Sequence, residues 1–540
     1  MVTRSFERSA RPQTDASERT RARSRRLGIT VIASAIGIVL AGFAGAGAAA
    51  RDNAGSRSAA TGTLNIGVLY LPFTLNPALN GYNVFNSYTL PSYGAMIYAT
   101  PTGKFVPGFA TSFGYVGTGN KVFQMTLRHD VRFNDGTLMT AKDVVASIKY
   151  FKIANGPEAS TLSGLSSVQA TGKWTVKLTL SSPNPLLPLL FSQEYTSGEI
   201  IEGKAIAKPS LMSNASFGAG PYMLDSSNTV LNDHYTFVPN PYFYDKSQQH
   251  YGKIVIKSIA NATSRLQALQ SGQVDVAYGD PSTADAAANS GFAVYYRAIA
   301  TQALFLFDRA GKLAAPLGDV RVRQALNYAI DRPAITKALF GKYALVTQEM
   351  ALQGSDIYDP KVKNTYAYNP AKAKQLLAAA GLGNGFTLTV LSSPGLNDLF
   401  CQALAGQFQA IGVKLDIVSE QPAQMSGDEF AGKFPAACSA YGDYVGWFSS
   451  QLLLQPTGVL NPLHSSDAQL NASLAKLAAV QYGTPDAITI GHQIADRVTS
   501  LAWFAPVFNL SEIWYANKKV AGVPLDFLGT SNILAYRPAK

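Results

Sequence analysis

The chain has 540 residues, of which 47% are hydrophobic and 15% are charged, a composition typical of a globular protein of two or three domains. Its formal net charge is +11, but residues 1–50 contain eight Arg against three acidic residues and account for +5 of that total. The remaining +6 is spread over the rest of the chain without a dense run of Lys and Arg, which argues against nucleic acid as a partner.

Residues 1–50 have the layout of an export signal. An Arg-rich stretch ends at Arg25-Arg26, an apolar stretch of 24 residues follows, and Ala48-Ala49-Ala50 fits a cleavage site. We expect a cleaved signal peptide at 1–50, a flexible lead-in at 51–61 and an exported periplasmic or cell-surface protein. Two questions stay open: the apolar stretch is long enough to remain as a membrane anchor, and the Arg pair is compatible with twin-arginine as well as general secretion. Since no Cys lies near the signal, we expect no lipid anchor.

Strand patterns dominate the part of the chain that follows. The stretch Thr63–Pro77 begins as an alternating strand and breaks at prolines. Lys121–Phe133 has a clear period of two, and Trp174–Leu180 predicts a further strand. We therefore expect a β-rich first third with short helices.

The stretch Arg132–Tyr150 carries two carboxylates that resemble an acid/base pair, but each has a local structural role. Asp135-Gly136 predicts a turn, because Gly accepts a positive φ cheaply. Thr140 and Asp143 have the spacing of a capping box, with Asp in place of Glu. An apolar helical stripe follows, formed by Val144, Val145 and Ile148. We interpret the stretch as a turn and a capped helix without a catalytic role.

The later part of the chain alternates strand and helix. Phe386–Ser393 predicts a strand, a helix follows from about Asn397 to Ile411, and Gly412 ends it. Val413–Glu420 and Phe434–Gly442 predict two more strands. Helical crossovers between such strands indicate a parallel or mixed sheet, so we expect an α/β region here.

Motifs for catalysis and for metal binding are missing. The sequence has no H-E-x-x-H and no G-x-S-x-G, its five His show no ligand spacing, and its two Cys cannot build a zinc site of the CxxC type. We expect no enzyme activity, no metal and no cofactor. Cys401 and Cys438 either form a disulfide, as is common in exported proteins, or remain two separate buried thiols.

Six segments together resemble the family 5 extracellular solute-binding proteins, the oligopeptide, dipeptide and nickel receptors of ABC importers. Two depart slightly from the family pattern, with Ala219 in place of Thr and Tyr244 in place of Trp. The segments, in the family's order, are LRHDVRFNDGTLMTAKDVVASIKY (Leu127–Tyr150), FGAGPYML (Phe217–Leu224), NPYFY (Asn240–Tyr244), SRLQALQSGQVDVAY (Ser264–Tyr278), DVRVRQALNYAIDRPAI (Asp319–Ile335) and YNPAKAKQLLAAAGL (Tyr368–Leu382).

The resemblance implies an α/β fold of the two-lobed periplasmic-binding-protein type (class II), whose hinge consists of two crossing segments. Lobe I is expected at 62–305 plus 506–540, with an extra β-rich subdomain at about 89–197, and lobe II at 306–505. The apolar runs Ala303–Asp308 and Trp503–Asn509 stand where the crossing strands are expected. The stretch Arg132–Tyr150 then falls in the extra subdomain, away from the ligand.

Within Asp319–Ile335, an apolar helical face is formed by Val322, Ala325, Leu326 and Ala329. Asp331 is predicted to cap the next helix, with Pro333 in its first turn. Arg321 and Arg323 are either anion ligands or ordinary solvated and salt-bridged side chains.

Candidate ligand contacts come from both expected lobes, and for each aromatic residue core packing is the alternative. In lobe I the candidates are Gly218, Ala219 and Gly220, whose backbone amides we expect to be exposed, with Tyr70, Phe73 and Tyr222. In lobe II they are Tyr441, Asp443, Tyr444 and Trp447, on a loop after a predicted strand, where α/β folds gather ligands.

The resemblance implies a monomeric receptor that captures a small polar or peptide-like solute and delivers it to a membrane permease. Many peptide-binding members place an Asp after the Trp447 segment, and this sequence has none there, which argues against free peptides. Two alternatives stay open: a secreted hydrolase, and a sensory or chaperone-like protein that reuses the fold.

Overall fold

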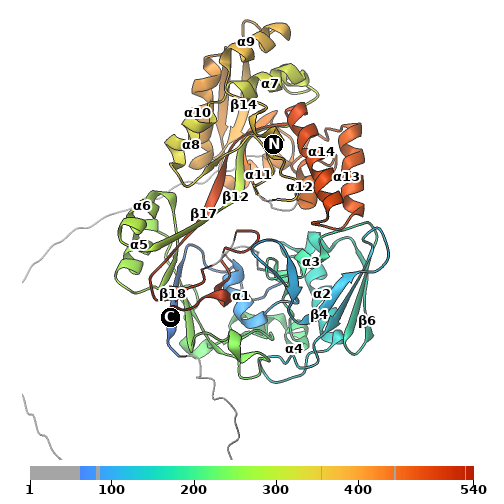
Figure 1. Ribbon diagram of the computed structural model, residues 1–540, viewed down its shortest axis with the longest axis vertical. Coiled ribbons are helices and arrows are strands. Elements are labelled where there is room, and N and C mark those ends of the chain that lie inside the picture. Colours follow the sequence, from blue (N-terminus) through green and yellow to red (C-terminus); the bar gives the residue numbers. More distant parts are fainter. Residues whose placement is uncertain (1–60, 81–84, 354, 443–445, 524, 530) are drawn as a thin grey trace, which may run out of the picture. The chain divides into compact units, whose positions relative to one another are not determined.

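The computed structural model describes residues 61–80, 85–353, 355–442, 446–523, 525–529 and 531–540 (Figure 1). The chain divides into two units, Met1–Arg57 and Ser58–Lys540, and all described residues belong to the second. The predicted signal peptide and the lead-in up to residue 60 lie outside the described residues. In the described part, no helix is long and apolar enough to cross a membrane.

One sheet runs through the whole described unit. Two long antiparallel strands form its middle, β12 (Ala293–Leu306) and β17 (Phe504–Ala516), which pair from Ala293 opposite Ala516 to Phe305 opposite Phe504. Figure 1 shows these two strands side by side. The predicted runs Ala303–Asp308 and Trp503–Asn509 overlap one end of each strand.

The sheet continues from both sides of this pair. Beyond β17 the order is β11 (Val276–Tyr278), β1 (Thr63–Val68), β10 (Lys253–Ser258), β9 (His234–Pro239) and β8 (Tyr222–Leu224). Beyond β12 it is β16 (Ala436–Tyr441), β14 (Phe386–Ser392) and β15 (Val413–Ser419), and the short β13 (Leu345–Val346) pairs with β17. We call the first group with its helices lobe I and the second group with its helices lobe II.

Lobe I packs α5 (Ala262–Gln270) and α6 (Pro281–Asn289) on one face of its strands, around Ile513 and Tyr515. On the other face α1 (Asn86–Tyr93) and the C-terminal segment cover a second core that contains Trp514 and Tyr222. The C-terminal segment contains the small pair β18 (Val520–Ala521) and β19 (Arg537–Pro538). The first strand, predicted within Thr63–Pro77, is β1.

Residues 97–198 contain a separate sheet, and we use the name extra subdomain for them. Its antiparallel sheet has the order β4 (Ala110–Tyr115), β5 (Val122–Leu127), β7 (Thr175–Leu180) and β6 (Leu165–Gly172). The remaining elements are the pair β2 (Ile97–Ala99) and β3 (Phe105–Pro107), α2 (Ala141–Ile153), and α3 (Leu187–Leu190); α4 (Gly203–Ala207) follows directly. The predicted period of two is confirmed in β5, where Phe123, Met125 and Leu127 are buried.

The turn and capped helix predicted at Arg132–Tyr150 are confirmed. Asp135 Oδ1 accepts a hydrogen bond from Thr137 N (2.8 Å), and Gly136 has a φ of 90°. The backbone N–H of Thr140 donates to Asp143 Oδ2 (2.8 Å) at the start of α2. Both carboxylates therefore serve the backbone, as the spacing predicted.

Lobe II is the α/β part. β14 pairs in parallel with β15 and with β16, which confirms the expected parallel or mixed sheet. Gly412, with a φ of 84°, follows α10 as predicted, and the Asp331 side chain caps α8 through Ala334 N (3.1 Å). The helices are α7 (Val320–Tyr328), α8 (Arg332–Phe340), α9 (Pro370–Ala379), α10 (Leu396–Gln409), α11 (Pro422–Phe430), α12 (Gly446–Leu453), α13 (Ala468–Ala479) and α14 (Pro485–Leu501).

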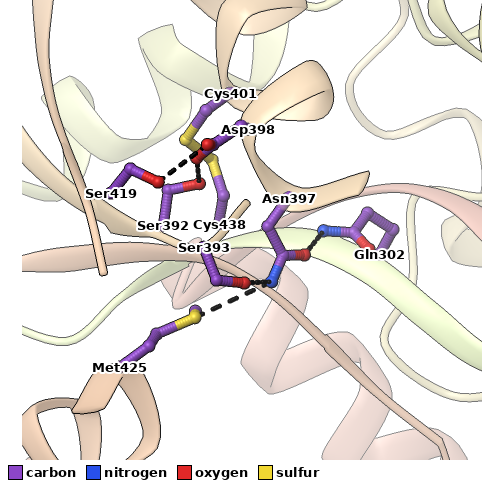
Figure 2. Close-up of a disulfide and its surroundings, with 9 residues drawn as sticks. All are labelled: Gln302, Ser392, Ser393, Asn397, Asp398, Cys401, Ser419, Met425 and Cys438. Carbon is purple, nitrogen blue, oxygen red and sulfur yellow. Dashed lines mark hydrogen bonds between the residues drawn. A yellow bond between two sulfur atoms is a disulfide. The ribbon is translucent and has the colours of Figure 1, made fainter. Parts of the chain in front are cut away.

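A disulfide joins Cys401 of α10 to Cys438 of β16, with a Cα–Cα distance of 5.9 Å (Figure 2). Both residues are fully buried in the lobe II core. Nearby, Asn397 of α10 accepts a hydrogen bond from Gln302 Nε2 of β12 (3.0 Å). The disulfide therefore fixes α10 to β16, and the hydrogen bond fixes it to β12, one of the two strands that connect the lobes.

Candidate ligand-binding site

A cavity of about 430 Å³ lies where the extra subdomain meets lobe II. Its volume is in the range of small-molecule sites, roughly 300–1,000 Å³. None of the described residues that line it is acidic or basic. The subdomain contributes Ser160, Thr161, Ser163, Gly164, Leu180, Ser182, Pro183, Asn184, Leu186 and Leu190, and lobe II contributes Trp447, Phe448, Gln451, Leu452, Gln455, Leu474, Ala475 and Ala478.

Trp447 reaches this cavity because α12 is fixed at its first residue. The Gly446 N–H donates to Asp356 Oδ1 (2.7 Å), so a carboxylate holds the helix N-terminus. A Cβ on residue 446 would lie 2.0 Å from Cγ2 of Ile357, so only glycine allows this approach. The Trp447 ring is partly buried and packs against the hydrophobic cores of both the extra subdomain and lobe II.

Direct contacts close the cavity around its rim. The buried Asn120 of the extra subdomain, with a φ of 51°, donates from Nδ2 to two carbonyls at the end of α13, Val480 O (2.7 Å) and Ala478 O (3.2 Å). The rings of Tyr195 and Phe448 lie 6.5 Å apart across the same interface. These contacts join residues that belong to different lobes, so a hinge motion that separates the lobes has to break them.

Two of the lobe I candidates, Tyr70 and Phe73, belong to a separate exposed aromatic cluster. Their side chains are 48% and 76% exposed, and the ring of Phe85 lies 5.9 Å from Tyr70 and 4.8 Å from Phe73. The Tyr88 hydroxyl donates to Tyr70 O (2.8 Å) and fixes the loop. The sequence interpretation missed Phe85, which stands in no motif. The cluster does not line the cavity at Trp447.

The interpretation of the loop at Gly218, Ala219 and Gly220 as a donor of free amides is wrong. All three residues are buried, and Gly220 N donates to Ser92 O (2.9 Å) of α1. A Cβ on residue 218 would lie 2.4 Å from the Tyr93 Cα, so the glycines serve the close approach of α1 and this loop.

Tyr222 is also a core residue. It is 1% exposed, and its hydroxyl accepts a hydrogen bond from Tyr251 N (3.0 Å). A side chain packed in this way has no surface left for a solute. The four candidates Gly218, Ala219, Gly220 and Tyr222 are therefore buried in lobe I and do not line the cavity at Trp447.

The four lobe II candidates divide into three groups. Asp443 and Tyr444 lie outside the described residues. Tyr441 is the last residue of β16, opposite Thr301 of β12, and packs partly buried against the lobe II core. Of the eight predicted contacts that the structure describes, Trp447 alone lines the cavity described above.

The two Arg of α7 are engaged within the protein. Arg321 is exposed and pairs with Asp319 (2.6 Å). Arg323 is buried and donates to the carbonyls of Leu317 (2.6 Å) and Leu501 (2.9 Å). In the described ranges, no group of three or more His, Cys, Asp or Glu side chains is arranged to hold a metal ion.

A second cavity, of about 280 Å³, lies within lobe II. It is lined by charged and aromatic side chains, among them Asp331, Arg332, Glu349 and Tyr366. Arg332 is 2% exposed and makes hydrogen bonds only to backbone carbonyls and to Asn327. Burial raises the pKa of Glu349 to about 8, although its hydrogen bond from Asp359 N acts in the opposite direction.

The family described as bacterial extracellular solute-binding proteins, family 5, matches residues 104–458. Heme-binding protein A of Haemophilus influenzae is 27% identical over 352 residues, 61% of this chain and 58% of that protein. The glutathione-binding protein GsiB of Escherichia coli O1:K1 is 26% identical over 333 residues, 61% of this chain and 64% of that protein. The matched part thus spans less than two thirds of these relatives. The structure of HbpA2 from Haemophilus parasuis has the same fold, with a TM-score of 0.78 at 21% identity over 89% of this chain and 100% of that one.

Proposed function

This chain belongs to the bacterial extracellular solute-binding proteins of family 5, and from that membership we propose that it is the receptor of an ABC importer. In this role it binds a small polar or peptide-like solute between its two lobes and delivers it to a membrane permease. The relatives named above bind heme and glutathione, so relatives with this fold differ in their ligands, and the fold leaves the solute of this chain open.

The observation that carries the proposal is the cavity shared by the extra subdomain and lobe II. The two lobes are joined by β12 and β17, a pair of strands that suits a hinge. A solute held by walls from both lobes contacts the closed form more than the open form. That difference in affinity is what a ligand needs to shift the population toward closure.

The same proposal covers the predicted division of the chain. Lobe I takes 62–305 and 506–540, with the extra subdomain at about 89–197, and lobe II takes 306–505. We further propose export by a cleaved signal at 1–50 without a lipid anchor, action as a monomer, and binding without chemical turnover or cofactor. The layout of residues 1–50 supports export, and the missing catalytic motifs support binding without turnover.

Native mass spectrometry of freshly exported protein tests the proposal. We expect a bound solute, whose removal expands the protein in small-angle X-ray scattering and whose return compacts it. We also expect the solute to be recovered unchanged, whereas a hydrolase would return a product. A protein that carries no solute and keeps the same radius of gyration in a metabolite extract would refute the receptor role.

N-terminal sequencing of the exported protein tests the signal. A mature chain that begins near Arg51 agrees with cleavage, and residues 1–50 retained in the membrane fraction indicate an anchor instead. A permease and an ATPase encoded beside the gene support import, whereas their absence favours a sensory or chaperone-like role.

A further inference from the structure

We infer that the cavity at Trp447 takes an uncharged group, rich in hydroxyls or amides, with an apolar face that stacks on the indole ring. This inference rests on the proposed receptor function and specifies the chemistry of the solute, or of the part of the solute that enters this cavity. Three features of the described lining residues carry it: they bear no charge, several of their hydrogen-bonding groups have no partner among the described residues, and their aromatic side chains come from lobe II.

The first feature is that no described lining residue carries a charge. On the subdomain wall the acidic residue nearest in sequence, Glu158, is turned away: it is 2% exposed, and its carboxylate accepts hydrogen bonds from Thr196 N (2.8 Å) and Ser197 N (2.7 Å). A charged solute group would lose water here without gaining a counter-ion from the described lining residues, which is costly. The described part of the walls therefore selects against ions of either sign.

The second feature is hydrogen-bonding capacity. The side chains of Ser160, Ser163 and Ser182 on one wall, and of Gln451 and Gln455 on the other, line the cavity. None of the five makes a side-chain hydrogen bond to another described residue. Hydroxyls and amides both donate and accept, so these groups suit a neutral partner that also does both.

The third feature is the aromatic surface of α12. Trp447 and Phe448 occupy successive positions on the lobe II wall, opposite the serines of the subdomain. A solute with one polar edge and one apolar face satisfies both walls at once. Small-molecule sites commonly combine such an apolar surface with a few polar groups that fix orientation.

A pair of disaccharides with the same ring skeleton tests the inference. N,N′-diacetylchitobiose is neutral and carries hydroxyls and amides, whereas its deacetylated form, chitobiose, is a cation at mildly acidic pH. In isothermal titration of solute-free protein, we expect the neutral probe to bind in the millimolar range or tighter, and at least about tenfold better than the cation. Equal binding of the two probes, or no saturable binding of the neutral one, overturns the inference.

Charge-insertion variants locate the binding. Gln451→Glu places a carboxylate in the cavity, so we expect it to weaken the neutral probe by about tenfold and to strengthen the cation. Gln169→Glu makes the same change at an exposed position of β6 outside the cavity and should leave both affinities as they are. If the two variants bind alike, the probe sits elsewhere and the inference fails. Thermal melts of both variants check folding.

The solute found by native mass spectrometry separates this inference from the receptor role. If the protein compacts on that solute but Gln451→Glu does not alter its affinity, the assignment of the cavity is wrong and the receptor role stands. If the solute carries a net charge on every part of its structure, the assignment is also wrong. If nothing binds and nothing compacts the protein, the receptor role itself fails.

Discussion

The two cavities described above differ in what builds their walls. The smaller one is lined within lobe II by residues 330–368, including Arg332 and Glu349, and the larger one is shared by the extra subdomain and lobe II and has no charged lining among the described residues. A hinge motion leaves the walls of the first cavity together and separates the walls of the second. The charge of Arg332 in the smaller cavity is engaged within the protein, because the guanidinium donates to the carbonyls of Tyr366 in lobe II and of Pro506 in the connecting strand β17. We therefore interpret the first as part of the lobe II framework and the second as the site that responds to solute.

The largest effect is expected at Arg332. Arg332→Met removes the donors to Pro506 O (2.6 Å), Tyr366 O (3.1 Å) and the backbone and side chain of Asn327. These buried acceptors would stay unpaired, so we expect the free energy of unfolding to fall by about 4 kcal/mol in chemical denaturation. Arg321→Met, on an exposed neighbour, should cost less than about 0.5 kcal/mol. If Arg332→Met lowers the free energy of unfolding only slightly, the guanidinium is not needed by these carbonyls and is available to a ligand.

The disulfide should have the next largest effect. Lobe II is closed covalently by Cys401–Cys438, whose partners are 37 positions apart in sequence, whereas the shared cavity depends on contacts alone. Reduction should lower the free energy of unfolding by about 3–4 kcal/mol on the chain-entropy estimate. Melts with and without reductant measure this, and the Cys401→Ala/Cys438→Ala variant is the control, since reductant should not change its melting temperature. A wild-type melt that reductant leaves unchanged would contradict the prediction.

Trp447→Ala tests the shared cavity. If the ring contacts solute, the affinity for the co-purified solute should fall by about 2 kcal/mol, as for aromatic hot spots. The ring is only partly buried, so its removal should lower the free energy of unfolding of the solute-free protein by less than the ~3–5 kcal/mol expected for a core Trp. Thermal melts of the solute-free variant measure this loss. Phe73→Ala removes an exposed aromatic from the other cluster and is the matched comparison. If the Trp447 variant binds the solute with full affinity, the solute does not contact this ring, and the exposed cluster of Tyr70, Phe73 and Phe85 becomes the next candidate site.

The two cavities should also differ in their response to pH. The pKa of Glu349 is raised by burial from 4.5 to about 8, so between these values the folded protein keeps a proton that the unfolded chain releases. The free energy of unfolding then falls as the pH rises through this window, by up to about 1.4 kcal/mol per pH unit from this group. Glu349→Gln should reduce the slope of the unfolding free energy against pH, measured by chemical denaturation at several pH values. Part of the slope should remain, because other buried carboxyls also have a raised pKa, such as Glu512 with a pKa of about 8.

Solute affinity is the contrasting readout for this pH series. The shared cavity has no titratable side chain among its described lining residues, so binding of a neutral solute should not follow the slope of Glu349. An affinity that changes with an apparent pKa near 8 would contradict the separation of the two cavities.

The smallest effect is expected at Asn120. Asn120→Gly keeps the left-handed backbone and removes the hydrogen bonds to Val480 O and Ala478 O, so the closed form should lose about 1 kcal/mol. Small-angle scattering of the solute-free protein should show a larger radius of gyration. Asn155→Gly changes an exposed left-handed Asn of the same subdomain, with a φ of 60°, and should leave the scattering unchanged. Identical curves for both variants would show that the Asn120 contacts do not hold the lobes.

The features that the sequence predicted correctly depend on near neighbours in the chain. The capping box at Thr140 and Asp143, the cap at Asp331, the period of two in β5 and the alternation of strand and helix around α10 all follow from residues within one or two turns of each other. For these features, local backbone chemistry was sufficient. The family and the two-lobed fold came instead from the resemblance of six motifs, in order, to a known family.

Tertiary structure alone decided the candidate site, because that depends on residues that meet across long separations. Asn120 and Val480 are 360 positions apart, and no pattern within either segment indicates their contact. The same applies to the uncharged walls of the shared cavity, which join residues near 160–190 to residues near 447–478. Gly218 and Gly220 suggested exposed amides by their composition, but α1 packs on them and takes their space. A glycine has the same letter whether a ligand or another backbone approaches it, and only the packing of the folded chain distinguishes the two.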